Sequence, residues 1–461
     1  MANTIINSIF NRSNGKFPYD YIDFEGNVLR TAEDIAVTNN LRLKDMEKEE
    51  GFAGWNSPFA KERIFQYCVK TDGLTPIKGG IAYKDPETGE IFDLRVSRFS
   101  GQILPVHAMF VPQTIIQYFG EHGVGKTLLM TQWICESRMF AGRKQGGKFL
   151  LMRDDPVDNP MDYPKEREIK EYFQGLLPDI TQITEKGYPY SFLASYTKDD
   201  RHKRGLIEFR DIAGEKCKEQ GYDSPVYTAD YILLLISARD LFDPSADLQL
   251  EHLLNVIRQK GMEFNQFSGK ILVALTMSDR FRERGVLPEL LSYNTLEREN
   301  GRLKMQTHKD GFCLSTQRTY SDAIAHYLEN EFPNIYLSLE SMGQAIEYFI
   351  VGSIDAMPEE GNRFPNDFVP YRIDEMLTYI LAQKGLYPYQ NEAQVQEQWK
   401  NESVNYQKKL HESMKEVEAE DLYDPEDDLY GDDFYDDEED DIIGRKQKDF
   451  FKKLLERMKI K

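Results

Sequence analysis

A glycine-rich stretch, Gly-Glu-His-Gly-Val-Gly-Lys-Thr, constrains this chain more than any other feature. It follows an apolar run at 114–119 and precedes a helix-like run at 128–134. In such a loop the glycines let backbone N–H groups surround a phosphate, the lysine reaches the β and γ phosphates, and the threonine hydroxyl suits Mg²⁺. The start of a helix adds the positive end of its dipole. The predicted phosphate-binding residues are Gly120, Glu121, His122, Gly123, Val124, Gly125, Lys126 and Thr127.

The region 112–350 alternates strand and helix signals, which predicts an α/β fold of the phosphate-loop NTPase type. Its sheet is expected to be mostly parallel and covered by helices on both faces, because the run 231–236 is almost wholly apolar. The predicted strands span residues 114–119, 148–152, 190–196, 206–210, 230–236, 271–276 and 334–339. The predicted helices span residues 126–140, 166–176, 246–260 and 317–330.

The segments on either side of this domain differ from it in composition. A polar lead-in without a sustained period is followed by a small antiparallel β element, in which Asp-Pro-Glu-Thr-Gly at 85–89 predicts a hairpin. An apolar-periodic helix is expected at 366–384. The expected boundaries are 1–62 for the lead-in, 63–111 for the β element, 351–390 for a helical extension, 391–444 for a polar and then acidic disordered segment, and 445–461 for a basic amphipathic helix.

The negative charge of the chain is local. The formal net charge is -21, but residues 416–441 hold 16 Asp or Glu and no Lys or Arg, so the remainder carries only -5. Self-repulsion keeps such an acidic block unfolded. The four cysteines are far apart without a C-x-x-C pair, and the N-terminus has no secretion signal, so the sequence predicts a soluble cytoplasmic protein without a disulfide framework.

The basic segment 445–461 suggests an interaction with a partner. It can form a short helix with an apolar side, which could pack on the chain itself, lie on a membrane surface as a peripheral contact, or enter a groove of a protein partner. The adjacent acidic run disfavours nucleic acid. Nothing in the sequence fixes the oligomeric state.

Two further motifs are expected at the ends of later strands. Asp211-Ile-Ala-Gly214-Glu follows the strand 206–210, and it fits a pattern in which the aspartate holds Mg²⁺ through water while the glycine N–H contacts the γ-phosphate. Thr276-Met-Ser-Asp279 follows the strand 271–276. With these motifs, the chain resembles the Ras-like GTPase class.

That resemblance implies that Asp279 accepts hydrogen bonds from the ring N–H and the exocyclic amine of guanine. Adenine would leave this carboxylate unpaired, at a penalty of about 1 to 3 kcal/mol. With Leu339-Glu-Ser341-Met-Gly, which is expected after a strand, the chain looks most like the bacterial double-GTPase-type domains over 112–350, and Thr276 and Ser341 join the predicted nucleotide contacts.

Three residues depart from the pattern of the class. Met277 replaces the lysine whose stem lies over the base, Glu215 replaces the glutamine that orients the attacking water, and His122 is bulky for its place in the loop. A glutamate cannot donate a hydrogen bond to a transition-state oxygen unless it is protonated, so hydrolysis is expected to be slow. The predicted catalytic residues are Lys126, Glu215 and Thr181, with Thr184 as an alternative to Thr181, and the predicted metal ligands are Thr127 and Asp211.

The sequence therefore predicts a guanine-nucleotide switch with slow Mg²⁺-dependent GTP hydrolysis, acting through protein partners in a bacterial multi-component system. One alternative is a nucleotide-dependent scaffold with little catalysis. Another is a phosphate-loop ATPase, which needs a second carboxylate near Asp211. Glu208 is disfavoured for that role, because it is expected to share a face with Arg210 only if the strand bulges.

Overall fold

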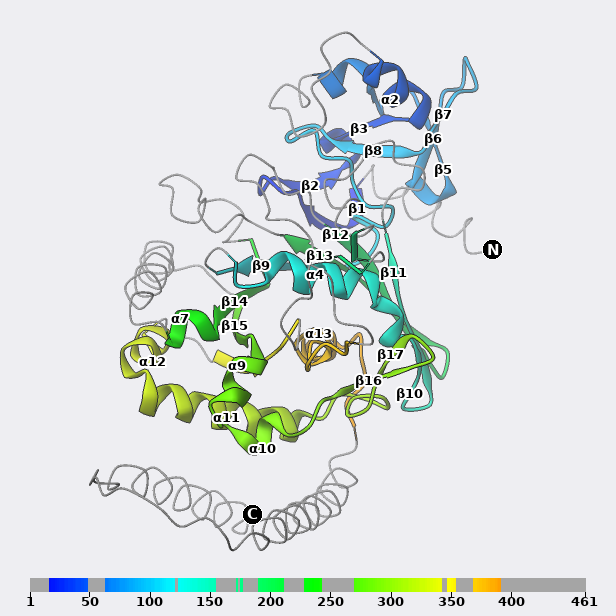
Figure 1. Cartoon of the computed structure of the whole chain (residues 1–461). Coiled ribbons are helices and arrows are strands. Elements are labelled where there is room, and N and C mark those ends of the chain that lie inside the picture. The colour runs from blue at the N-terminus through cyan, green and yellow to red at the C-terminus, as the bar shows by residue number, and fades with distance from the viewer. Residues whose placement is uncertain are drawn as a thin grey trace, which may run out of the picture. The chain divides into compact units, whose positions relative to one another are not determined.

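The computed structural model describes residues 16–48, 63–120, 123–154, 171–172, 175–176, 190–210, 228–242, 269–341, 346–353 and 368–390. An eight-stranded sheet runs through this part of the chain (Figure 1). Its strands, in spatial order, are β10 (Gly142–Lys144), β11 (Gly147–Arg153), β12 (Tyr190–Lys198), β13 (Arg201–Arg210), β9 (Gln113–Phe119), β14 (Tyr231–Ser237), β15 (Lys270–Thr276) and β18 (Ile346–Ile350).

The sheet is mostly parallel, as expected. Strands β13, β9, β14, β15 and β18 pair in parallel, whereas β10, β11, β12 and β13 form antiparallel pairs at the other side. The carboxyl ends of the parallel strands therefore meet at one edge, where ligands of open α/β sheets bind.

Strand β14 explains why the sheet needs helices on both faces. All seven of its residues are buried. Leu233 and Leu235 pack in one core with helices α4 (Lys126–Cys135) and α13 (Asp374–Gln383). Leu234 and Ile236 pack in a second core on the opposite face, because successive side chains of a strand point in opposite directions. The helices that contribute to this second core are α7 (Ala238–Phe242), α9 (Ser278–Glu283), α10 (Pro288–Leu291), α11 (Leu314–Glu331) and α12 (Pro333–Glu340).

The predicted strand at 334–339 is wrong. These residues form helix α12, with Pro333 in its first turn, where a proline fits because its missing N–H would have no intrahelical partner. Ile335 and Leu339, four residues apart, are buried, while Leu337 is 64% exposed. The strand that completes the sheet is β18, which follows the helix.

The other strand predictions correspond to observed strands. The predicted strand at 206–210 is the second half of β13, which begins five residues earlier. The predicted helix at 126–140 comprises α4 and a 3-10 turn, η4 (Ser137–Met139), and the helix at 317–330 lies within α11. Helix α13 begins at Asp374, later than the expected start at residue 366.

The N-terminal region contains more regular structure than expected. Strands β1 (Lys16–Ile22), β2 (Val28–Thr31) and β3 (Ile35–Thr38) and helix α2 (Asn40–Glu47) lie within the segment expected to be a loose lead-in. That expectation is wrong for these residues, because Phe17, Tyr21 and Leu29 pack in a core with Leu193 and Leu206 of the large sheet.

Small antiparallel sheets follow β1 and β2. One contains β4 (Val69–Lys70), β3 and β8 (Leu94–Ser97), and another contains β5 (Thr75–Ile77), β6 (Ala82–Lys84) and β7 (Ile91–Phe92). The predicted hairpin at 85–89 joins β6 to β7. Its Asp85 carboxylate accepts from the Glu87 N–H at 2.8 Å, and Gly89 has a φ of 76°. The sequence therefore placed this turn correctly.

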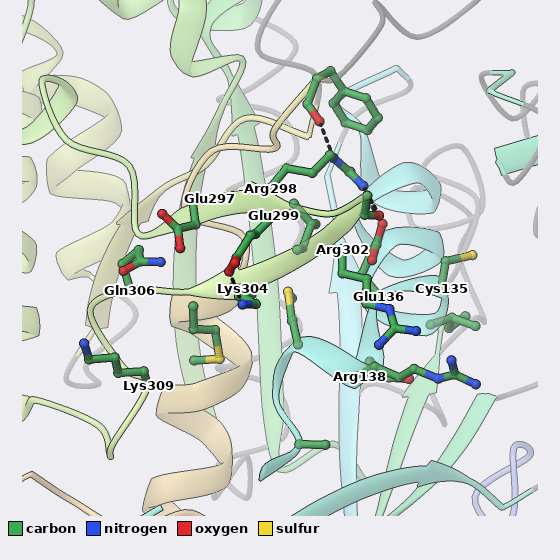
Figure 2. Close-up of a pocket in the computed structure, with 18 of the residues that line it drawn as sticks. Cys135, Glu136, Arg138, Glu297, Arg298, Glu299, Arg302, Lys304, Gln306 and Lys309 are labelled. Atoms are coloured by element: carbon green, nitrogen blue, oxygen red, sulfur yellow. Dashed lines mark hydrogen bonds and ion pairs between the residues drawn. The ribbon is translucent and has the colours of Figure 1, made fainter. Parts of the chain in front are cut away.

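A second hairpin, β16 (Leu296–Glu299) and β17 (Arg302–Met305), lies beside the C-terminal end of α4. Together with η4 it borders an open cavity lined by both charged and apolar side chains (Figure 2). Arg298 holds the hairpin in place, because it donates to the Phe368 carbonyl at 3.1 Å and lies 3.6 Å from a Glu136 carboxylate oxygen.

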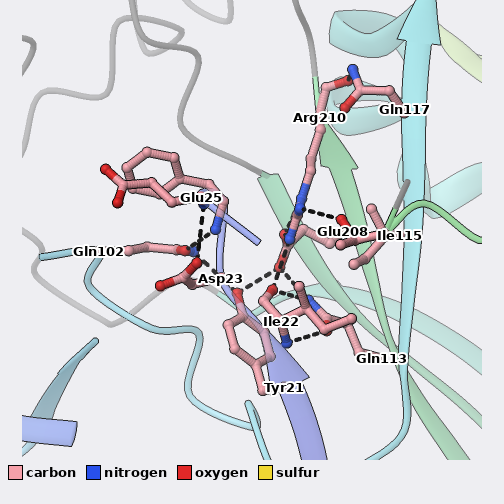
Figure 3. A network of polar contacts seen from close by, with 12 residues as sticks. Tyr21, Ile22, Asp23, Glu25, Gln102, Gln113, Ile115, Gln117, Glu208 and Arg210 are labelled. Atoms are coloured by element: carbon pink, nitrogen blue, oxygen red, sulfur yellow. Dashed lines mark hydrogen bonds and ion pairs between the residues drawn. The ribbon is translucent and has the colours of Figure 1, made fainter. Parts of the chain in front are cut away.

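A buried polar network attaches β1 to β13 (Figure 3). The Tyr21 hydroxyl donates to Glu208 at 2.6 Å, and the Arg210 guanidinium donates to the same carboxylate at 2.7 Å and to the Ile22 carbonyl at 2.7 Å. Burial, reinforced by the charge of Glu208, raises the pKa of Tyr21 well above its usual value, so the phenol stays protonated and remains a donor.

The expected geometry of Glu208 is wrong. The pairing of β13 with β12 and β9 is continuous, so the strand does not bulge, and Glu208 lies on the same face as Arg210 because alternate residues of a strand share a face. Glu208 is nevertheless a poor candidate for the second carboxylate of an ATPase site, because it is fully buried and bonded to Tyr21, Gln113 and Arg210.

Several predicted segments lie outside the described residues. They are the helix at 246–260, most of the helix at 166–176, the acidic segment and the basic segment 445–461. In the part of the chain that is described, no helix is both long enough and apolar enough to cross a membrane. Cys68, Cys135 and Cys313 are free thiols there.

Candidate nucleotide-binding site

The glycine-rich loop connects β9 to α4 at the carboxyl edge of the sheet. Gly120 has a φ of 150°, and a Cβ added to it would lie 2.7 Å from the Leu235 carbonyl oxygen and 2.9 Å from Val124. Gly123 and Gly125 have φ values of 79° and 91°, which residues other than glycine rarely adopt. The loop conformation therefore requires glycine at these positions.

Lys126 is folded back over the loop. Its buried ammonium donates to the Gly120 carbonyl at 2.7 Å. Thr127 follows it in the first turn of α4, half-buried. Both side chains thus lie where the N–H groups at the start of the helix are directed, the environment that binds anions at helix N-termini.

The remaining strand ends lie next to this loop in the order of the sheet. Arg210, the last residue of β13, pairs in register with Gln117, and Gln117 donates to the Arg210 carbonyl at 2.8 Å. The end of β13 at Arg210 therefore lies beside β9. Asp211 itself, together with the other predicted residues Glu121, His122, Thr181, Thr184, Gly214 and Glu215, lies outside the described residues.

The segment expected to read the base follows β15. Thr276 is buried, and its hydroxyl makes no hydrogen bond within the described part of the chain. Met277 has a left-handed backbone, with φ 62° and ψ 55°, and Asp279 lies half-buried in the first turn of α9. Left-handed backbone at a side chain of this size carries strain that is concentrated at functional loops. The turn brings Asp279 to the same edge of the sheet as the glycine-rich loop.

The placement of Ser341 at a strand end is wrong. It follows helix α12, is exposed, and its hydroxyl donates to the Ser338 carbonyl at 2.7 Å. The last strand of the sheet is β18, and the chain leaves the sheet through residues 351–353. There the Ser353 carbonyl accepts a hydrogen bond of 2.6 Å from Gln132 of α4.

Sequence reasoning overlooked Arg239. This residue lies in α7, directly after β14, whose end falls between the strands that carry the glycine-rich loop and the Thr276–Asp279 turn. A Cβ added to Gly123 would lie 3.5 Å from Nη2 of Arg239. Its side chain is 58% exposed, with a guanidinium nitrogen 3.7 Å from Asp240. The signal in the sequence was a basic residue just beyond a wholly apolar strand.

Of the two predicted metal ligands, Thr127 lies in the first turn of α4, and Asp211 lies outside the described residues. Thr127 supplies a hydroxyl beside Lys126, and the oxygens of a hydroxyl and a carboxylate are ligands that suit Mg²⁺. Among the described residues, no group of three or more His, Cys, Asp or Glu could hold a metal. In comparisons with known proteins, no family model and no curated protein matches the chain.

Proposed function

We propose that the protein is a guanine-nucleotide-binding switch that hydrolyses GTP slowly in the presence of Mg²⁺. The observation that supports this most is the order β13-β9-β14-β15, which brings the end of β13 at Arg210, the glycine-rich loop, Arg239 and Asp279 to one edge of the sheet. A phosphate chain on the loop would leave the base near the Thr276–Asp279 turn, where the buried Thr276 hydroxyl has unused hydrogen-bonding capacity.

Each side chain has a role in this proposal. Lys126 exchanges its bond to the Gly120 carbonyl for the phosphates, and Arg239 adds a second positive charge beside Gly123. Thr127 and Asp211 would hold Mg²⁺, which supplies positive charge to the phosphate oxygens. Water near Glu215 attacks the γ-phosphorus, the bond to the bridging oxygen breaks, and GDP leaves with that electron pair.

Slow turnover follows from Glu215. An ionised glutamate accepts a hydrogen bond from the attacking water but donates none to the transition state. The switch itself would be a change in the segment that begins at Asp211, since contacts to the γ-phosphate are lost on hydrolysis. A protein partner would recognise the nucleotide-bound state. The resemblance to the double-GTPase-type domains suggests that this partner belongs to a bacterial multi-component system.

The test is a nucleotide panel. Thermal unfolding is measured with GTP, GDP, ATP and ADP, each with Mg²⁺, and phosphate release is measured with GTP and ATP. Guanine nucleotides at 100 times their Kd should stabilise the protein by about 2.7 kcal/mol. Equal stabilisation by ATP would support the ATPase alternative, and GTP binding without phosphate release above background would support the scaffold alternative.

Asp279→Asn should change the preference for the base. An amide offers only one acceptor to the two donors of guanine, but its N–H can donate to the 2-carbonyl of xanthine. We expect GTP affinity to fall by about 1 to 3 kcal/mol, roughly 5- to 150-fold, and xanthosine triphosphate to bind more tightly than GTP. Competition binding measures both, with Asp322→Asn of α11 as the control. An unchanged preference would show that Asp279 does not contact the base.

Arg239→Ala should weaken GTP binding by about 1 to 2 kcal/mol, because a charge-assisted contact to phosphate is lost. Arg239→Lys should recover part of this loss, since the charge is kept. Arg204→Ala, at an exposed arginine of β13, removes the same charge away from the loop and serves as the control. Equal affinities for the Arg239→Ala and control variants, measured by titration at two salt concentrations, would remove Arg239 from the site.

A further inference from the structure

The cavity beside the β16–β17 hairpin is separate from the glycine-rich loop. It lies at the C-terminal end of α4, whereas the loop precedes the N-terminal end of this ten-residue helix. At a rise of 1.5 Å per residue, the two ends are about 15 Å apart. The cavity is open to solvent and has a volume of about 1210 Å³, which exceeds the space that a nucleotide-sized molecule needs.

Positive charge dominates the walls of this cavity. Among the described residues, seven basic side chains line it against three acidic ones. Two of the three carboxylates are already engaged, since Glu136 accepts from Tyr172 and lies beside Arg298, and Glu299 is paired with Lys304. Figure 2 shows these pairs side by side on the hairpin and the end of α4.

Three further cations at the rim are exposed and have no carboxylate partner in the part of the chain that the structure describes. They are Arg138 of η4, Arg302 of β17 and Lys309. Exposed cations alone are common on protein surfaces and do not define a site. Their convergence on one cavity is informative because a buried cation lies in the same wall.

Lys144 is that buried cation. The residue is only 4% exposed, and its ammonium lies 5.5 Å from the centre of the Tyr387 ring. No ion pair to it is found among the described residues, but the charges of Asp310 and Asp374 act on it from a longer distance. Burying a charged group away from a counter-ion is costly. Burial accordingly lowers the pKa of Lys144 to about 8, which still leaves most of it protonated at neutral pH. A bound anion would add a closer counter-charge than Asp310 and Asp374 provide.

The cavity also has an apolar wall. Ile134 and Met139 from the end of α4 and from η4, Leu303 and Met305 from β17, and Phe368 line it. A simple inorganic anion would leave this wall in contact with water. A molecule that carries phosphate groups on an apolar or planar body would satisfy both parts of the lining.

We propose that this cavity is a second ligand site, which binds a small molecule bearing two or more phosphate groups, with Lys144, Arg138, Arg302 and Lys309 as the phosphate contacts. The site goes beyond the nucleotide switch and does not depend on it. Because the cavity adjoins the end of the helix that begins at the glycine-rich loop, both sites would act on α4 from opposite ends.

The test uses inorganic tripolyphosphate as the probe and isothermal titration of the full chain. The variant Arg302→Glu/Lys309→Glu reverses two exposed charges at the rim, and Lys144→Met removes the buried charge at similar volume. The control Lys70→Glu/Lys84→Glu reverses two exposed lysines of β4 and β6. Lys126→Ala removes the lysine of the glycine-rich loop.

Lys126→Ala removes competing binding of the probe to the glycine-rich loop, so all other variants are made in that background. There tripolyphosphate should still bind, equally well with the control changes, and at least about tenfold more weakly with either set of cavity changes. The unfolding midpoint of the rim variant should match that of the control, which separates loss of binding from loss of fold. The proposal is overturned if binding disappears in Lys126→Ala alone, if the cavity variants bind normally, or if the control weakens binding as much as they do. None of these results decides whether GTP binds the glycine-rich loop.

Discussion

Replacing Lys126 with alanine is expected to weaken GTP and GDP binding at least about 100-fold, because charge-assisted bonds to two phosphates contribute about 1.5 to 3 kcal/mol each. The free protein should tolerate the change. Its ammonium donates to the Gly120 carbonyl, and an ordinary hydrogen bond stabilises a fold by about 1 kcal/mol. Fluorescent-nucleotide titration gives the affinity and urea unfolding gives the stability.

Lys148→Ala is the matched control, because Lys148 is an exposed lysine on β11 of the same sheet. It should leave both nucleotide affinity and stability unchanged. If Lys126→Ala binds GTP as tightly as this control does, the glycine-rich loop is a structural turn and the proposed function fails. If Lys126→Ala unfolds instead, the smaller Thr127→Ser and Thr127→Ala pair tests the same loop, with Mg²⁺-dependent affinity as the measurement.

The second large effect is expected on stability. Glu208→Ala should destabilise the fold by about 3 to 5 kcal/mol, because it leaves the Arg210 guanidinium buried without its counter-ion. Two guanidinium nitrogens lie 2.6 and 2.7 Å from this carboxylate, and both side chains are almost fully buried. The Tyr21 hydroxyl would also lose its acceptor, and the Gln113 amide would keep only the Ile22 carbonyl as an acceptor.

An exposed ion pair provides the comparison. Asp20 and Arg30 lie 3.0 Å apart but are 52% and 58% exposed, so Asp20→Ala should cost well under about 1 kcal/mol. Urea unfolding of the two variants measures the difference. Similar losses from Asp20→Ala and Glu208→Ala would mean that the network of Figure 3 contributes little to stability.

The network of Tyr21, Glu208 and Arg210 also connects β1 to the strand end that precedes Asp211. Arg210 immediately precedes Asp211, and its side chain is bonded to the Ile22 carbonyl of β1. Tyr21→Phe removes the hydrogen bond to Glu208 and the one accepted from Gln102 but keeps the packing, so it should loosen this strand end with about 1 to 2 kcal/mol of lost stability. A change in GTP affinity in that variant would show that the N-terminal strands influence the segment after β13.

Local signals predicted much of the central fold. The glycine-rich loop between an apolar run and a helix placed β9 and α4, and Asp-Pro-Glu-Thr-Gly placed the β6–β7 hairpin, because each depends on the conformational preferences of a few adjacent residues. A run that is apolar at every position indicated that β14 is buried on both faces. These features need no information from distant parts of the chain.

Short or polar segments were not predictable in this way. The run 334–339 is too short for periodicity to separate a strand from a helix, and its helical state depends on burying Ile335 and Leu339 against the sheet. Strand β1 alternates polar and apolar residues with little overall hydropathy, and it is ordered by contacts with β12 and β13 that lie far along the chain.

The sequence by itself determined the residue types of the candidate site: a loop that only glycines can form, a lysine and a threonine after it, and aspartates beyond two later strands. Only the tertiary structure decided which strand ends are neighbours, because strand order is set by long-range pairing and burial. That order placed Arg239 beside Gly123, removed Ser341 from the strand ends, and gathered the cations of the second cavity from segments that are remote in the chain.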